Sequence, residues 1–112
     1  MRCLAVITLA LLVLTGCQTT DYAAELKRVR PLAERGDAAA QNSLGVMYHW
    51  GYGVTKDYAE AIRWYRKAAK QENAGGQYNL GYMYSNGRGV TRDYKEAVRL
   101  RWYVNISNIS YG

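Results

Sequence analysis

The chain has 112 residues, which is one small domain at most, and 15 Lys and Arg against 9 Asp and Glu give it a formal charge of +6. The basic residues are spread along the chain, and no helix-turn-helix, zinc-finger or RNA-binding motif accompanies them. This pattern is typical of a solvated surface and argues against nucleic acid as a partner. Phe is absent while Tyr occurs 11 times, which suits a small domain whose large side chains are only partly buried.

The first segment of the chain has the features of a secretory leader. Arg2 supplies a positive start, and residues 4–14 are apolar apart from Thr8. An apolar run of this length is too short to span a bilayer, which takes about 20 helical residues. It fits the h-region of a signal peptide instead.

The run ends in Leu14-Thr15-Gly16-Cys17, which resembles the lipobox of bacterial lipoproteins, where a small residue precedes the cysteine that is acylated. The resemblance implies a signal peptide over residues 1–16, fatty acids such as palmitate on Cys17, and a lipidated linker over residues 17–20. Several acyl chains would anchor the protein stably in a membrane. The alternative is an ordinary cleaved signal with an incidental cysteine.

The residue after the lipobox cysteine bears on location. Gln18 stands where an Asp would favour the inner membrane in such lipoproteins. We therefore expect a cell-envelope protein at the outer membrane, facing the periplasm. Cys3 would be lost with the leader, so the mature chain would lack a free thiol for a disulfide, a redox site or a metal.

The remainder of the chain repeats itself with a period of 36 residues, and such a period is the signature of a repeat architecture. A weaker echo lies one period earlier, over residues 21–33. The identical pairs of the main repeat are Gln41/Gln77, Leu44/Leu80, Gly45/Gly81, Met47/Met83, Tyr48/Tyr84, Gly51/Gly87, Gly53/Gly89, Val54/Val90, Thr55/Thr91, Asp57/Asp93, Tyr58/Tyr94, Glu60/Glu96 and Ala61/Ala97.

Each unit has the pattern of two helices separated by a glycine turn. Residues 38–49 carry small and apolar side chains at helical spacing. Gly45 and Gly81 fall in the middle of the first helices, where glycine costs about 1 kcal/mol relative to alanine. That cost at the same place in both units indicates a close approach of two helices. Gly51 and Gly53 then end the first helix.

Acidic residues mark the start of each second helix. Asp57 and Asp93 are predicted N-caps. Glu60 and Glu96 follow three residues later, which predicts a variant of the capping box, in which the Glu side chain accepts a hydrogen bond from the backbone N–H of the cap residue.

The whole pattern, Ala38-x-x-Gln41-x-x-Leu44-Gly45-x-x-Tyr48-x-x-Gly51-x-Gly53-Val54-x-x-Asp57-x-x-x-Ala61-x-x-Trp64-Tyr65-x-Lys67-Ala68-Ala69, is similar to the Sel-one-like repeat (SLR), a relative of the tetratricopeptide repeat. The resemblance implies an all-α fold, a short α-solenoid of about five antiparallel helices. It covers about residues 21–99, and we expect the repeat region to extend over residues 21–104, divided into a half unit 21–36, a unit 37–72 and a unit 73–104.

Two departures from the SLR pattern affect the helices. Glu72 stands where the pattern expects the glycine found at Gly36, and the neighbouring Gly75-Gly76 could take over that turn. Pro31 falls inside the first expected helix, where proline costs up to about 3 kcal/mol. It predicts a kink near Arg30 or a helix broken in two.

The largest departure lies at the end of the second unit. Leu100-Arg101 stands where Trp-Tyr is expected, and Trp102-Tyr103 is displaced by two residues. The tail over residues 105–112 is rich in β-branched and turn residues, so we expect it to be frayed or extended.

No catalytic constellation stands out, and we expect no catalytic residue, no metal site and no cofactor. His49 is the only histidine, so it has no second imidazole for a metal set. Some SLR proteins with cysteine pairs are linked to β-lactam hydrolysis. The mature chain lacks those cysteines and any Ser-x-x-Lys motif. An SLR-type hydrolase acting on cell-wall or β-lactam compounds remains the enzymatic alternative.

Solenoids present an extended surface to partners, and in the SLR family the first helices line it. Residues that differ between units are free of the stacking role and are the candidate binding surface. Exposed Tyr and Trp are common at binding hot spots, although the tyrosines could instead pack on a neighbouring helix. The candidates are Asn42, Val46, His49, Trp50, Tyr78, Tyr82 and Ser85.

The sequence therefore predicts a lipid-anchored envelope protein that binds other proteins through its repeats. Two and a half units fall short of the three or so that an independent core usually needs. The chain could be marginally stable alone, form a homodimer end to end, or use a larger partner as a cap. It could also be a truncated repeat remnant without independent function.

Overall fold

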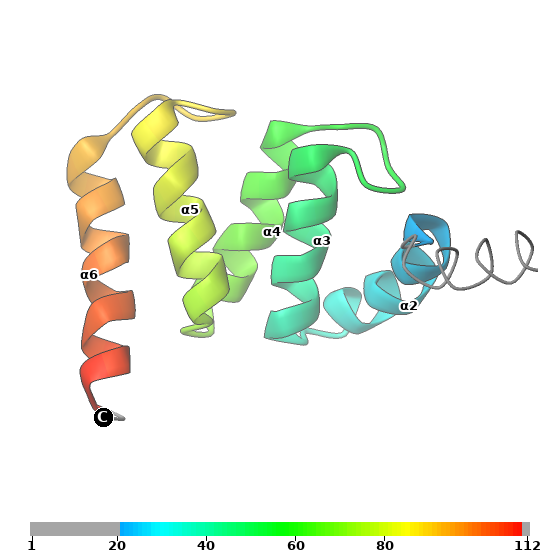
Figure 1. The fold of residues 1–112 in the computed structure, drawn as a ribbon, viewed down its shortest axis with the longest axis horizontal. Coiled ribbons are helices and arrows are strands. Elements are labelled where there is room, and N and C mark those ends of the chain that lie inside the picture. Colours follow the sequence, from blue (N-terminus) through cyan, green and yellow to red (C-terminus); the bar gives the residue numbers. More distant parts are fainter. Residues whose placement is uncertain (1–20, 111–112) are drawn as a thin grey trace, which may run out of the picture.

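The computed structural model describes residues 21–110, with the backbone alone for Tyr103 and residues 106–110. The expected signal peptide, the linker and Cys17 lie outside the described residues. The helices are α2 (Tyr22–Glu34), α3 (Ala38–Trp50), α4 (Tyr58–Lys70), α5 (Ala74–Asn86) and α6 (Tyr94–Ser110). They stand in a row in chain order (Figure 1). The predicted all-α solenoid of five helices is confirmed, and residues 21–110 contain no strand.

Glycines in the middle of α3 and α5 bring each of these helices close to the next one. A Cβ atom on Gly45 would lie 2.5 Å from Cδ1 of Tyr65 and 3.2 Å from the carbonyl oxygen of Ala61 in α4. A Cβ atom on Gly81 would lie 3.3 Å from the carbonyl oxygen of Ala97 in α6. The close helix approach predicted from the repeated glycines is confirmed.

The turn inside each unit covers the second helix of the unit before it. Gly51 and Gly53 adopt φ of 74° and 70°, in the left-handed region that glycine tolerates. A Cβ atom on Gly53 would lie 2.7 Å from the carbonyl oxygen of Tyr22, and one on Gly89 would lie 2.8 Å from Cβ of Tyr58. Both turns therefore stack the units by packing a glycine against the tyrosine that begins the preceding second helix.

The core consists of two clusters of buried side chains, and each cluster draws on three consecutive helices. Neither cluster could form within one unit, so the units stabilise one another by stacking. The first cluster contains Val29, Ala33, Ala40, Leu44, Met47 and Trp64, and the second contains Ala61, Ile62, Tyr65, Leu80, Met83 and Leu100.

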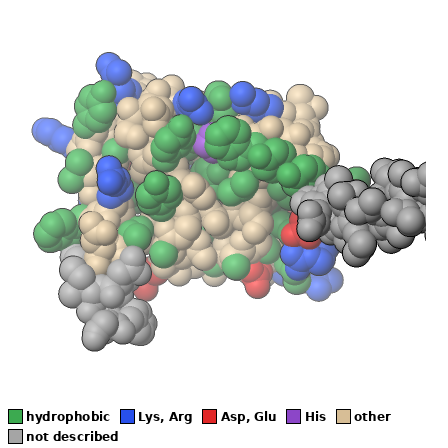
Figure 2. All heavy atoms as spheres, viewed as in Figure 1, with side chains coloured by type: hydrophobic (Ala, Val, Ile, Leu, Met, Phe, Trp, Pro, Cys, Tyr) green, Lys and Arg blue, Asp and Glu red, His purple; other side chains and the backbone are tan. Residues whose placement is uncertain are grey.

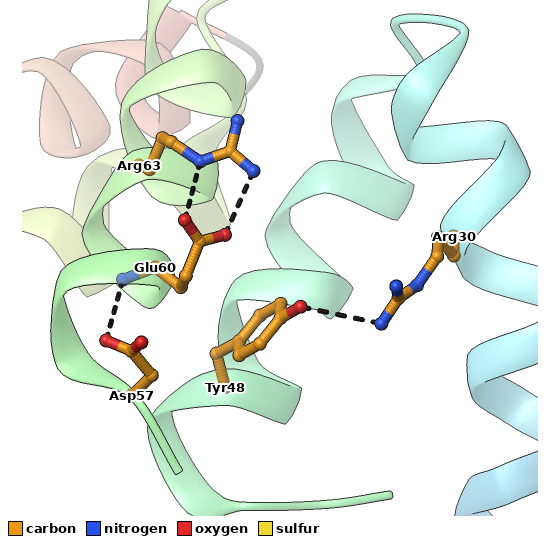
Figure 3. A network of polar contacts seen from close by, with 5 residues as sticks. All are labelled: Arg30, Tyr48, Asp57, Glu60 and Arg63. Carbon is orange, nitrogen blue, oxygen red and sulfur yellow. Dashed lines mark hydrogen bonds and ion pairs between the residues drawn. The ribbon is translucent and has the colours of Figure 1, made fainter. Parts of the chain in front are cut away.

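Polar contacts between helices repeat with the same period. Arg30 donates to the hydroxyl of Tyr48 at 3.4 Å (Figure 3), and Arg66 donates to the hydroxyl of Tyr84 at 3.0 Å. Both contacts join a second helix to the first helix of the next unit. These contacts were not predicted from the sequence, although the Arg and Tyr of each pair recur 36 residues apart.

The predicted N-caps are confirmed. The carboxylate of Asp57 accepts a hydrogen bond from the Glu60 N–H at 3.1 Å, and Asp93 accepts one from the Glu96 N–H at 3.1 Å. Three further caps, Asp21, Asp37 and Asn73, begin α2, α3 and α5.

The predicted capping box is wrong. The backbone N–H of Asp57 donates to the carbonyl oxygen of Tyr48 at 2.8 Å, so it is not available to Glu60. The carboxylate of Glu60 instead accepts two hydrogen bonds from Arg63, at 3.0 and 2.9 Å (Figure 3). In the next unit, Glu96 likewise forms an i,i+3 ion pair with Arg99 in place of the capping box.

Helix α2 is one element although it contains Pro31, so the alternative of a helix broken in two is wrong, while the kink near Arg30 stays a prediction. Proline removes one backbone donor. The rest of the helix remains supported, because Asp21 caps its N-terminus and Val29 and Ala33 are buried against α3 and α4. One missing hydrogen bond does not outweigh that packing.

The turn after α4 also differs from expectation. Glu72 itself takes the left-handed conformation, with φ 61°, where Gly36 has φ 102° one unit earlier. Gly75 and Gly76 lie in the first turn of α5 and do not replace it. Gly76 serves packing instead, because a Cβ atom there would lie 2.6 Å from Cβ of Ala68.

Helix α6 continues to Ser110, so the expectation of a frayed or extended tail is wrong for residues 105–110. Ile, Asn and Ser are only weakly unfavourable in a helix, and residues 94–110 contain no Gly or Pro that would stop it. The helix keeps the 36-residue register without a slip. Leu100 takes the buried position of Trp64, and the displaced Trp102 is 63% exposed.

Candidate binding surface

The single histidine is buried at the end of α3. His49 is 3% exposed, so the expectation that its side chain lies on the binding surface is wrong. Its Nδ1 lies 3.2 Å from the hydroxyl of Tyr65 in α4, within hydrogen-bond distance. Its Nε2 is buried and has no hydrogen-bond partner among the residues described.

The surroundings of His49 favour its neutral form. Burial lowers the pKa of His49 below its usual 6.5, and the positive charges of Arg88 and Lys56 lower it further. Burial also raises the pKa of the Tyr65 hydroxyl. The pair is therefore uncharged at neutral pH, and it acts as a structural contact between α3 and α4.

Aromatic rings surround His49 on the outer side. The Trp50 ring stacks on the imidazole at 4.6 Å between centroids, and the Tyr58 ring meets it edge-on at 5.6 Å. The Tyr82 ring of α5 lies 5.8 Å away. In Figure 2 the purple imidazole is almost covered by hydrophobic side chains, with Lys and Arg side chains near the same edge of the molecule. The buried histidine thus supports aromatic rings from three helices.

Three of the predicted surface residues are exposed aromatic side chains. Trp50 is 53% exposed, Tyr78 55% and Tyr82 36%. We call Trp50, Tyr78 and Tyr82 the aromatic surface. It joins α3 and α5, the first helices of the two full units. The alternative that the two tyrosines pack on a neighbouring helix holds in part for Tyr82, whose ring centroid lies 5.8 Å from that of His49 in α3.

The other candidates lie around this surface but are partly buried. The amide of Asn42 accepts a hydrogen bond from Asn79 at 2.9 Å, which ties α3 to α5. Val46 packs against the second core cluster. Ser85 donates to the carbonyl oxygen of Tyr82 at 2.9 Å. Asn42 and Val46 therefore have packing roles, and Ser85 lies at the edge of the aromatic surface.

Basic side chains border the aromatic surface, and they were not predicted from the sequence. The Arg88 guanidinium lies 5.6 Å from the centroid of the Tyr82 ring, and the Lys56 ammonium lies 4.9 Å from that of Tyr58. Arg101 shares a small recess of about 110 Å³ with Tyr78, Tyr82 and Ser85. The signal for these cations was weak, because scattered Lys and Arg cannot be assigned to one face without the fold.

The arrangement suits binding of a partner's side chains. Exposed Trp and Tyr rings bury large apolar area at low entropic cost, and the adjacent cations can attract carboxylates. Within residues 21–110 no three His, Cys, Asp or Glu side chains cluster as metal ligands. No helix in the described part of the chain combines the length and apolar character needed to cross a membrane.

Comparison with known proteins identifies the repeat. The sequence profile of the Sel1 repeat matches residues 38–73 and 74–100, which is more than half of the chain. A comparison with curated protein sequences gives no match.

Two solved structures are similar to this chain. One is a protective antigen present in uropathogenic Escherichia coli strains that displays an SLR fold, with a TM-score of 0.75 and 38% identity. The alignment covers 78% of this chain and 19% of the antigen. The other is a Sel1 repeat protein from Oxalobacter formigenes, with a TM-score of 0.66 and 32% identity over 77% of this chain and 40% of that protein. The chain thus spans less than half of the length of both proteins, and it belongs to the Sel1 repeat family.

Proposed function

We propose that the chain is a non-enzymatic protein-binding module of the bacterial cell envelope, and that its aromatic surface contacts the partner. One observation carries this proposal. Trp50, Tyr78 and Tyr82 remain exposed on adjacent first helices although the stacking of the repeats does not require them to be there. Their counterparts in the other unit are Asn86, Asn42 and Val46, so aromatic character at these positions is not part of the repeat.

The composition of the surface supports a protein partner with apolar and acidic groups. Trp and Tyr are enriched at the energetic centres of protein interfaces. Arg88 and Lys56 add positive charge beside the rings, and they would steer an acidic segment toward it. The proposed contact therefore combines aromatic anchors with a basic border.

The envelope location rests on the leader. Residues 4–14 and the sequence Leu14-Thr15-Gly16-Cys17 support acylation of Cys17 and anchoring in the outer membrane. The anchor would hold the repeats at the periplasmic face. Labelling with a palmitate analogue tests this step, because the label is expected on the wild type and lost in Cys17→Ser.

Photocrosslinking in living cells tests the binding surface. A photoreactive amino acid at position 78 is expected to give a discrete adduct with an envelope protein. The same residue at position 95, which is exposed on α6 and is not part of the aromatic surface, is the matched control and is expected to give none. Equal adducts at both positions, or none at position 78, would contradict the proposal.

A further inference from the structure

A second recess lies between α4, α5 and α6, away from the aromatic surface. Its volume is about 430 Å³. Its apolar floor includes Ala69, Leu80 and Leu100. Its charged lining consists of Arg66, Lys70, Glu72, Glu96 and Arg99, of which Glu96 and Arg99 form an ion pair. The volume falls in the range of ligand pockets, about 300–1,000 Å³.

The same place in the preceding unit is filled by a tryptophan. Ala33, Leu44 and Trp64 occupy the positions 36 residues before Ala69, Leu80 and Leu100, and these three pack together in the first core cluster. Trp64 is only 5% exposed. Its indole therefore fills the space that corresponds to the recess.

Cations hold the indole in that first site. The Arg63 guanidinium lies 4.5 Å and the Lys67 ammonium 4.4 Å from the ring centroid of Trp64. Such contacts over the face of an indole are attractive because the face is electron-rich. The second site keeps the arginine, since Arg99 follows Arg63 by 36 residues and lines the recess.

Leucine at position 100 leaves the second site without a ring. The side chain of Leu100 is buried at the floor, but it is aliphatic and much smaller than the indole of Trp64. A cavity of about 150 Å³ already holds a benzene ring in a protein core. The recess is therefore large enough for the indole that its walls accommodate one unit earlier.

The chain's own displaced tryptophan does not supply that ring. Trp102 follows Leu100 by two residues on one continuous helix, and two helical steps turn it about 200° around the axis, away from the recess. Its 63% exposure agrees with this placement. None of the tryptophans in the described part of the chain therefore lines the recess, and the proposed indole comes from another molecule.

We propose that the recess between α4, α5 and α6 binds the indole of a tryptophan side chain presented by a partner protein. The partner's ring takes the position that Trp64 takes in the first unit, on Ala69, Leu80 and Leu100 and under Arg99. This deepens the proposed binding function by specifying one side chain of the partner, but it uses a separate site. The two can therefore fail independently.

Titration of the full chain with N-acetyl-tryptophanamide tests the site, using NMR of the leucine methyl groups. Saturable shifts are expected for Leu80 and Leu100. Leu100→Trp fills the recess from within and is expected to weaken binding at least tenfold. The matched control is Val98→Trp, which adds an indole to the exposed side of the same helix and leaves binding unchanged.

A second variant, Arg99→Ala, tests the same site if Leu100→Trp does not fold. Arg99→Ala is expected to weaken binding several-fold by removing the cation over the ring. Absence of binding in the wild type, or binding as tight as the wild type in both recess variants, would overturn the proposal. A tighter complex in Trp102→Ala would also overturn it, because a second copy would then be the occupant. Tyr78→Ala is expected to leave probe binding unchanged, which separates this site from the aromatic surface.

Discussion

Gly45 of α3 lies so close to Tyr65 of α4 that a Cβ atom on the glycine would be 2.5 Å from Cδ1 of the ring. The ring is fully buried, and its hydroxyl reaches His49 on the same helix as Gly45. The two helices of this unit are thus held at a spacing that only glycine permits. The same position in the next unit is looser, since Gly81 faces the Ala97 carbonyl at 3.3 Å.

Gly45→Ala is therefore expected to destabilise the fold by about 2 kcal/mol or more, because a buried ring and a helix must move apart. Gly81→Ala is the matched control and is expected to change stability by less than about 1 kcal/mol. The higher helix propensity of alanine offsets the cost of the tighter contact between α5 and α6. Urea denaturation of the purified chain measures both. Equal losses would show that the spacing of α3 and α4 is not specially tight.

Glu72→Gly is expected to raise the free energy of unfolding by about 1 kcal/mol. Glu72 has φ 61°, and a left-handed conformation costs a residue with a side chain about 1–2 kcal/mol. Glu72→Ala keeps that cost and should leave stability unchanged. The reverse change, Gly36→Ala, should lower stability at the corresponding turn, where φ is 102° and no heavy atom lies within 4 Å of the added Cβ.

Mutation should distinguish the contribution of the N-caps to stability from that of the exposed ion pairs. Asp57→Ala is expected to cost about 1 kcal/mol, because the Glu60 N–H loses its acceptor at the start of α4. Glu60→Gln removes the exposed pair with Arg63 and should cost less than about 0.5 kcal/mol. A larger loss in Glu60→Gln than in Asp57→Ala would mean that the Glu caps the helix after all.

Stability should depend on pH through His49. Its pKa is lower in the folded chain than 6.5, so the unfolded chain binds the extra proton first and stability falls as the pH drops below 6.5. Above pH 6.5 the histidine is neutral in both the folded and the unfolded chain, so it no longer changes the stability. His49→Asn, which does not titrate, should flatten the curve from pH 6.5 down to the carboxylate range. A wild-type curve that rises on acidification would contradict the assignment.

A second fall in stability is expected at lower pH. Arg99 lowers the pKa of Glu96 below 4.5, and Arg28 does the same for Glu25. The charged forms of these two carboxylates stabilise the folded chain above pH 4.5, and this stabilisation is lost as the pH falls through their lowered pKa values. Melting curves of wild type and Glu96→Gln from pH 6 downward separate this loss from that of His49.

The period of the sequence predicted most of the fold, because the repeated glycines and caps each serve a backbone geometry that recurs in every unit. The boundary of α6 was not predictable in this way, since weak helix propensity at residues 105–110 does not end a helix that is already formed. The tolerance of Pro31 depends on packing of Val29 and Ala33 that only the folded chain shows.

The candidate site was predicted in part. Trp50, Tyr78 and Tyr82 were found because they differ between units, and they are exposed. His49 differs too, but it varies for a structural reason, since its partner Tyr65 is replaced by Arg101 in the next unit. Variation between units therefore marks either a surface or a changed internal pair, and only burial distinguishes them.

The most direct test of the account is the affinity of the crosslinked envelope partner for the purified chain. Trp50→Ala combined with Tyr78→Ala is expected to raise Kd at least tenfold while the helical circular dichroism spectrum stays unchanged. The matched control, Val98→Ala with Trp102→Ala, removes exposed apolar side chains from α6 and should leave Kd within about twofold, since scattered surface contacts carry little binding energy. An unchanged Kd in the first variant, or an equal loss in the control, would contradict the assignment of the aromatic surface.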